Sequence, residues 1–152
     1  MNDIETLPVL DAEAVAYHEL GHALAGIDQG LVVYGIEFER CGQGWGGRAL
    51  CQEDVPDELI PAYLVFLTAG TEASLIHCEQ TGAPVQDFAH QDRVYHAGVV
   101  QYAAERGVSD LPSWEEAALE AREVVLRLWP RITALAPVLA EQKVMIRSEL
   151  MG

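Results

Sequence analysis

The segment His18-Glu19-Leu20-Gly21-His22 places two histidines four residues apart, with a glutamate directly after the first. Residues four apart on an α-helix lie about 40° apart around its axis and share one face. Two imidazole nitrogens on one face can bind a single metal ion, and a carboxylate about 100° away lies beside that ion without binding it. The pattern therefore predicts a zinc site formed by His18 and His22.

Glu19 gives this predicted site a chemical role. Zinc lowers the pKa of a bound water to roughly 7, and a neighbouring carboxylate can accept the proton that the water loses. The activated water then attacks a polarised carbonyl carbon, as in metal-assisted hydrolysis. We therefore expect Glu19 to act as the general base of a zinc hydrolase.

A third zinc ligand must come from elsewhere in the chain. Catalytic zinc sites usually have three protein ligands and an open fourth position. The residues after His22 lack the H-x-x-G-x-x-H continuation of the metzincin pattern. Several carboxylates and histidines farther along are candidates, and spacing alone does not choose between them: Glu72, His77, Asp87, His90, Asp92 and His96.

The motif lies in a segment that is predicted to be helical. Asp11 is a suitable N-cap, the sequence from 14 to 25 is rich in alanine, and Gly30 is suited to end the helix. The next residues, 31–40, are rich in β-branched and aromatic side chains and predict a strand. A cluster of glycines then favours a hairpin, with 48–51 as its returning strand.

The rest of the chain is predicted to be helical. A second helix fits residues 56–78 and a third fits 87–106. Ser113 begins a capping-box pattern that opens a long fourth helix, in which Pro130 and Pro137 are candidate interruptions. These elements predict a mainly α fold with one small β-hairpin.

The composition is that of one globular domain over residues 1–152, because 50% of the residues are hydrophobic and 22% are charged. Nine basic residues against 24 acidic ones give a net charge of −15, which argues against nucleic acid or an anionic membrane surface as the main partner. This charge also favours a monomer or small oligomer over a large ring.

The sequence shows no pattern typical of a membrane span, a targeting segment or paired cysteines. No run approaches the roughly 18 apolar residues of a membrane helix. The first residues are acidic and do not resemble a targeting segment. The three cysteines form no C-x-x-C pair, so we expect neither a disulfide framework nor a cysteine-rich zinc site. We expect a cytoplasmic protein.

Several segments resemble one known family. Residues 16–26 resemble the zinc helix of the peptidase domain of FtsH-type ATP-dependent zinc metalloproteases, which reads A-Y-H-E-A-G-H-A-[LIV]-x-[AG]. Residues 35–42 are similar to the strand that precedes that family's R-G-x-A-L-G-x-T turn, and 67–73 are similar to its L-A-G-R-A-A-E helix. Residues 132–136 and 139–141 resemble its closing helices, so the similarity spans nearly the whole chain in order.

This resemblance implies a zincin-like helical peptidase domain with a small β-hairpin beside the zinc helix. Thr81-Gly-Ala83, followed by Asp87, resembles the family's T-G-A-x-x-D-L, whose aspartate is the third zinc ligand. The resemblance thus implies zinc bound by His18, His22 and Asp87. The gap is one residue longer here than in the family, so Asp92 is the main rival, followed by Glu72.

The implied activity is that of a zinc-dependent endopeptidase that hydrolyses peptide bonds. The chain contains no G-x-x-x-x-G-K-[ST], so we expect it to act without ATP by itself, on peptides or unfolded proteins, alone or with a separate unfoldase. In similar zinc proteases an edge strand beside the zinc helix pairs with the substrate backbone, and residues 33–39 are the candidate strand, with an ordinary core hairpin as the alternative.

Two other functions stay open from the sequence. The first is a non-catalytic zinc-binding interaction module that retains the peptidase fold. The second is a zinc hydrolase that acts on a small non-peptide amide. Glu19 favours catalysis, because a purely structural zinc site has no need of a general base.

Overall fold

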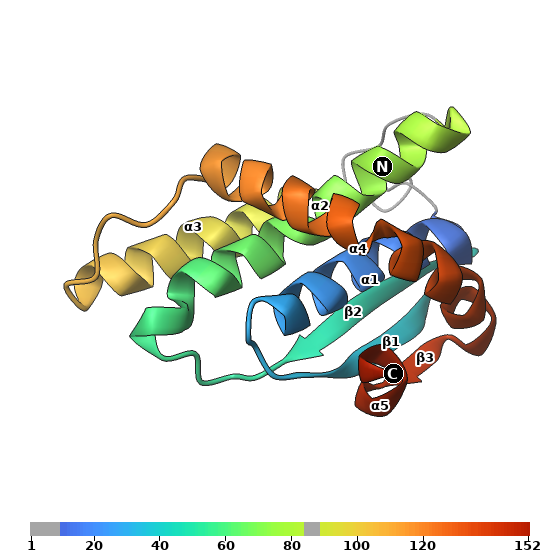
Figure 1. Ribbon diagram of the computed structural model, residues 1–152, viewed down its shortest axis with the longest axis horizontal. Coiled ribbons are helices and arrows are strands. Elements are labelled where there is room, and N and C mark those ends of the chain that lie inside the picture. Colours follow the sequence, from blue (N-terminus) through green and yellow to red (C-terminus); the bar gives the residue numbers. More distant parts are fainter. Residues whose placement is uncertain (1–9, 84–88) are drawn as a thin grey trace.

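The computed structural model describes residues 10–83 and 89–152. Over these ranges the protein is mainly helical, with one small antiparallel sheet beside the helices (Figure 1). The elements in chain order are α1 (Ala12–Asp28), β1 (Val33–Cys41), β2 (Gly44–Cys51), η2 (Asp57–Leu59), α2 (Ile60–Thr81), α3 (His90–Glu105), α4 (Trp114–Gln142), β3 (Val144–Ile146) and α5 (Arg147–Met151). The predicted mainly α class and the predicted hairpin are confirmed.

Helix α1 lies at the centre of the molecule and packs against α2, α4 and the sheet (Figure 1). Its N-terminus forms as predicted, because the Asp11 side chain accepts a hydrogen bond from the backbone N–H of Ala14 at 2.7 Å. Gly21 lets α1 approach α2 closely, since a Cβ at this position would lie 2.6 Å from the Cβ of Ala73. The H-E-x-x-H segment is thus held directly against α2.

The sheet has the strand order β2-β1-β3, so β1 is its central strand. It pairs antiparallel with β2 along its length and with β3 over Gly35–Glu37. The expectation that residues 33–39 form an edge strand was therefore wrong, and the edge beside α1 belongs to β2. The missed element is β3, which follows α4 after Lys143 turns the chain in a left-handed conformation.

Helix α2 is the most apolar segment of the described chain. The helical stretch Asp57–Thr81 is long and apolar enough to cross a membrane by length and composition, and 72% of its apolar 18-residue window is buried inside the fold. Pro61 lies in the first turn, where its missing N–H costs no helical hydrogen bond. Because α2 packs against α1, α3 and α4, the core of the fold accounts for its apolar character.

Helix α4 begins with the predicted capping box, in which the backbone N–H of Glu116 donates to Ser113 Oγ at 3.1 Å. The candidate interruptions at Pro130 and Pro137 do not occur, and the helix continues through both. Both prolines lie on the exposed side of the helix, so the carbonyls that lose a helical partner can bond to water.

Candidate metal centre

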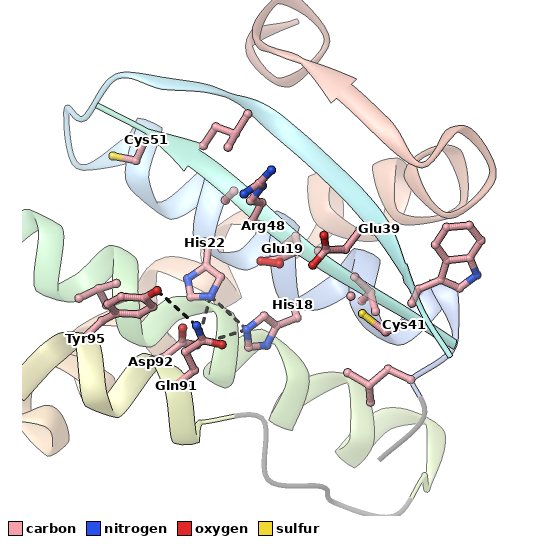
Figure 2. A pocket seen from close by; sticks show the side chains of 18 of the residues that line it. His18, Glu19, His22, Glu39, Cys41, Arg48, Cys51, Gln91, Asp92 and Tyr95 are labelled. Carbon is pink, nitrogen blue, oxygen red and sulfur yellow. Dashed lines mark hydrogen bonds and ion pairs between the residues drawn. The ribbon is translucent and has the colours of Figure 1, made fainter. Parts of the chain in front are cut away.

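Three side chains from two helices converge on one point of the structure (Figure 2). The Nε2 atoms of His18 and His22 lie 3.0 Å apart. Asp92 Oδ2 lies 3.3 Å from the first nitrogen and 3.2 Å from the second. His18 and His22 are one turn apart on α1, as their spacing predicted, and Asp92 comes from the first turn of α3.

The spacing of these three atoms suits a tetrahedral ion. Zinc binds nitrogen and carboxylate oxygen at about 2.0–2.2 Å, which places neighbouring tetrahedral ligands roughly 3.3–3.5 Å apart. The observed separations of 3.0, 3.2 and 3.3 Å need only a small expansion to match. Asp92 Oδ2 is buried and faces the two histidine nitrogens, so a cation held between the three atoms would neutralise its negative charge.

Hydrogen bonds on the far side of each imidazole orient the two rings. His22 Nδ1 lies 2.7 Å from the carbonyl oxygen of Phe66, which can only accept, so this nitrogen carries a proton and donates. His18 Nδ1 lies 2.9 Å from Ser74 Oγ. With both Nδ1 atoms protonated, the Nε2 atoms present their lone pairs toward Asp92, which is the arrangement that a metal requires.

A glycine on α2 makes room for the second histidine. A Cβ at Gly70 would overlap the imidazole of His22, with the ring nitrogen Nε2 as its nearest atom. Gly70 therefore leaves room for the ring next to the α2 backbone, and the Phe66 carbonyl one turn earlier accepts its hydrogen bond.

Without a metal, the three groups form a charge-coupled cluster. Burial disfavours a charged imidazole, but the Asp92 carboxylate outweighs this effect and raises the pKa of His22 to about 9. Burial also opposes charge on Asp92, yet the two histidines hold the pKa of its carboxyl well below the ordinary value. The metal-free site therefore holds a proton on His22 at neutral pH, and a metal must displace it.

Glu19 is buried beside the three ligands (Figure 2). Burial raises the pKa of its carboxyl, although the two histidines act in the opposite direction. Strand β2 approaches it through Gly47, where a Cβ would lie 3.0 Å from Glu19 Cγ. This carboxylate is not part of the three-atom cluster, in agreement with the helical geometry of the motif.

No protein-family model matches the chain, and no curated protein matches it significantly. The site is therefore interpreted from the geometry of its own residues.

Of the candidate third ligands, the structure places one beside the two histidines and places Glu72 elsewhere. Asp92 joins them, whereas Asp87 lies outside the described residues. Glu72 pairs instead with Arg122, with 3.5 Å between Oε1 and Nη1. Helix α3 begins at His90 and not at 87, which places Asp92 in its first turn.

The three histidines outside the motif have other surroundings. His77 stacks on Tyr17, with 3.9 Å between the ring centroids. His90 lines the cleft next to the ligands without belonging to the three-atom cluster. His96, a candidate ligand from the sequence, lies outside the three-atom cluster and is buried with its ring edge against Trp114. Its neighbour Trp114 opens α4, a contact that no local pattern around His96 indicates.

A cleft of about 1110 Å³ runs past the metal centre. Its walls come from α1, β2, α2 and the start of α3. Strand β2 forms one rim of the cleft. At its outer edge, which faces away from β1, the Trp45 N–H donates a hydrogen bond to the Leu10 carbonyl at 3.0 Å. Because backbone groups alternate along a strand, Gly47 and Ala49 also direct their N–H and C=O groups away from β1.

Proposed function

We propose that the protein is a zinc-dependent metallopeptidase in which His18, His22 and Asp92 hold the metal and Glu19 is the general base. The observation that carries the proposal is the convergence of the three ligand atoms to 3.0–3.3 Å beside a buried glutamate. A structural zinc site has four protein ligands, whereas this cluster has three among the described residues and opens into a cleft.

Glu19 has the properties of a proton carrier. Zinc, when bound, would polarise a substrate carbonyl and activate a water for attack on it. The raised pKa of Glu19 lies closer to neutral pH than that of an ordinary carboxyl group. This suits a group that takes a proton from the attacking water and gives it to the leaving amine. Gly47 keeps β2 close to this carboxylate and shields one side of it from solvent.

The rim of the cleft favours a peptide chain as the substrate. The outward backbone groups of Gly47 and Ala49 can pair with an extended chain as an added strand. Such pairing binds the backbone whatever its side chains, and it requires an unfolded segment. A peptide or an unfolded protein, alone or delivered by a separate unfoldase, is therefore the proposed substrate.

The size of the cleft favours a peptide over a small amide as the substrate. Pockets for small molecules usually have volumes of roughly 300–1,000 Å³. The cleft here, at about 1110 Å³, is larger and is bounded along one side by a strand edge. These features favour an endopeptidase of the zincin type over a hydrolase of small amides, in line with the similarity of the zinc helix to FtsH-type peptidases.

The decisive experiment compares zinc content with hydrolysis of denatured casein. The wild-type protein is expected to hold about one zinc per chain and to cleave casein in the absence of ATP. Glu19→Gln should retain zinc and lose at least about a hundredfold in rate, because general-base catalysis contributes roughly 10²–10⁴-fold. Glu13→Gln, the same change on the exposed first turn of α1, is the matched control and should be fully active.

Other outcomes reject parts of the proposal. Loss of zinc in Glu19→Gln would make Glu19 a ligand and overturn its assignment as the base. Zinc binding without cleavage of casein or of unfolded peptides would reject the peptidase in favour of a non-catalytic zinc-binding module. Absence of zinc from the wild-type protein after zinc is supplied would reject the metal centre itself.

A further inference from the structure

One end of the cleft is walled by aromatic rings. Phe66 and Tyr63 come from adjacent turns of α2, and Tyr95 comes from α3, one turn beyond Asp92. Cys51, at the end of β2, lines the same part of the cleft. Figure 2 shows Tyr95 and Cys51 on the side of the ligands away from Cys41 and Glu39.

This aromatic wall begins directly at the metal centre. The ring of Phe66 lies 5.3 Å from the ring of His22, measured between centroids. Tyr63 stacks on Phe66 at 5.5 Å with an angle of 24° between the rings. A side chain placed against this wall would belong to a residue next to the bond that is cleaved, because His22 is itself one of the proposed metal ligands.

Tyr95 has exposed surface for a ligand to cover. Its side chain is 53% exposed although it lines the cleft, and its hydroxyl accepts a hydrogen bond from Gln91 Nε2 at 3.2 Å. This bond holds the phenol at the mouth of the cleft (Figure 2). An exposed aromatic ring beside a buried one is a favourable surface for a further ring, because aromatic rings pack at centroid distances of 4.5–7 Å.

Electrostatics at this end disfavour an acidic ligand. Burial raises the pKa of the Tyr63 phenol, and Cys51, Tyr95 and Asp92 nearby act in the same direction. A neutral phenol can share the site with an uncharged ring, whereas a second carboxylate would be repelled and desolvated. The sulfur of Cys51 is a further partner that suits an aromatic ring.

We propose that Tyr63, Phe66 and Tyr95 form a subsite for an aromatic side chain of the substrate, on a residue adjacent to the scissile bond. This inference rests on the proposed peptidase function and narrows its substrate class to peptides that carry phenylalanine, tyrosine or tryptophan at that position. Backbone pairing with β2 binds any extended chain, and the subsite then selects where along the chain it is cut.

The test reads cleavage positions in denatured casein by mass spectrometry for four proteins. In the wild type, aromatic residues are expected next to cleaved bonds several-fold more often than their share of the sequence. Tyr95→Ala should lose this preference, and Tyr95→Phe should keep it because the ring remains. Tyr102→Ala is the matched control, since Tyr102 is on the same helix, 57% exposed, and bonded to Arg106 outside the cleft.

A binding measurement separates this inference from the peptidase proposal. Zinc-loaded Glu19→Gln is titrated with N-acetyl-phenylalaninamide and N-acetyl-alaninamide and followed by NMR. Stronger binding of the aromatic compound, lost in the Glu19→Gln/Tyr95→Ala double variant, supports the subsite even where no casein is cleaved. Cleavage without aromatic preference, or equal binding of the two compounds, overturns the subsite and leaves the peptidase proposal standing.

Discussion

His22 donates a hydrogen bond from Nδ1 to the backbone carbonyl of Phe66 at 2.7 Å, so the α2 backbone fixes which nitrogen of this histidine faces the metal site. A backbone carbonyl cannot donate, and it is held in place by the helix around it. The bond therefore leaves His22 Nε2 free to act as the proposed ligand atom without any metal being present.

The third ligand can be tested by a pair of aspartate variants. Asp92→Asn should lower zinc affinity by more than about a hundredfold, because even a residue that only supports a ligand is worth 10–100-fold. Asp87→Asn should change the affinity by less than about threefold. Both affinities are measured by competition with a chromophoric chelator. The opposite pattern would assign the ligand to Asp87, as the FtsH-type resemblance implied.

Gly70 should be intolerant of even one added carbon. Gly70→Ala would place a methyl group inside the His22 ring, so the ring must move and zinc affinity should fall by at least about tenfold. Gly98→Ala is the matched control, because Gly98 is helical with no atom within 4 Å of the added carbon. This control should melt at the same temperature or higher, given alanine's better helix propensity. Unchanged zinc affinity in Gly70→Ala would contradict the close approach.

Ser74 is expected to act on zinc through His18. Ser74→Ala removes the hydroxyl 2.9 Å from His18 Nδ1 and should reduce zinc affinity by roughly 10–100-fold while the fold is retained. The exposed Ser148→Ala change on α5 serves for comparison and should have no effect. Equal affinities for the two variants, in the same chelator competition, would show that this contact does not orient the ring.

The pH dependence of stability should differ with and without zinc. In the metal-free protein the pKa of His22 is raised from 6.5 to about 9, so its pairing with Asp92 stabilises the fold fully below about pH 6.5. That contribution is lost as the pH rises through about 9. Zinc needs the neutral imidazole, so the stabilisation that it provides should grow over the same interval.

Thermal melting between pH 6.5 and 8.5, with a chelator or with excess zinc, measures this difference. The gap between the two melting temperatures should widen with pH. Asp92→Asn removes the carboxylate that raises the pKa of His22, so its metal-free curve should be flatter. A gap that is constant in the wild-type protein would exclude displacement of a proton from His22.

The sequence was sufficient to predict what depends on short spacing. Asp11 caps α1 and the two motif histidines share a face, because both follow from helical geometry within a few residues. It did not predict β3, since Val144–Ile146 is three residues long and becomes a strand only by pairing with β1. The burial of His96 likewise depends on Trp114, which comes from the next helix.

The resemblance implied Asp87 as the third ligand with Asp92 as the main rival, and the sequence could not decide between them for a related reason. Several carboxylates follow the motif, and which one meets His18 and His22 depends on where α3 begins and how it lies against α2. A difference of three residues in the start of this helix changes which aspartate lies in its first turn. Long-range packing determines which aspartate meets the two histidines, and the periodicity within the segment does not indicate it.

Helix α3 buries only two of its side chains, His96 and Ala103, yet it supplies Asp92. An ion shared between α1 and α3 would join segments 70 positions apart in the chain, and because the site exists only in the folded protein, its binding free energy would stabilise that connection. Chelation should then release the helix locally, so that its amide hydrogens exchange with solvent faster than those of α1. The metal would thus add to the His22–Asp92 ion pair in holding the α3 wall of the cleft in place.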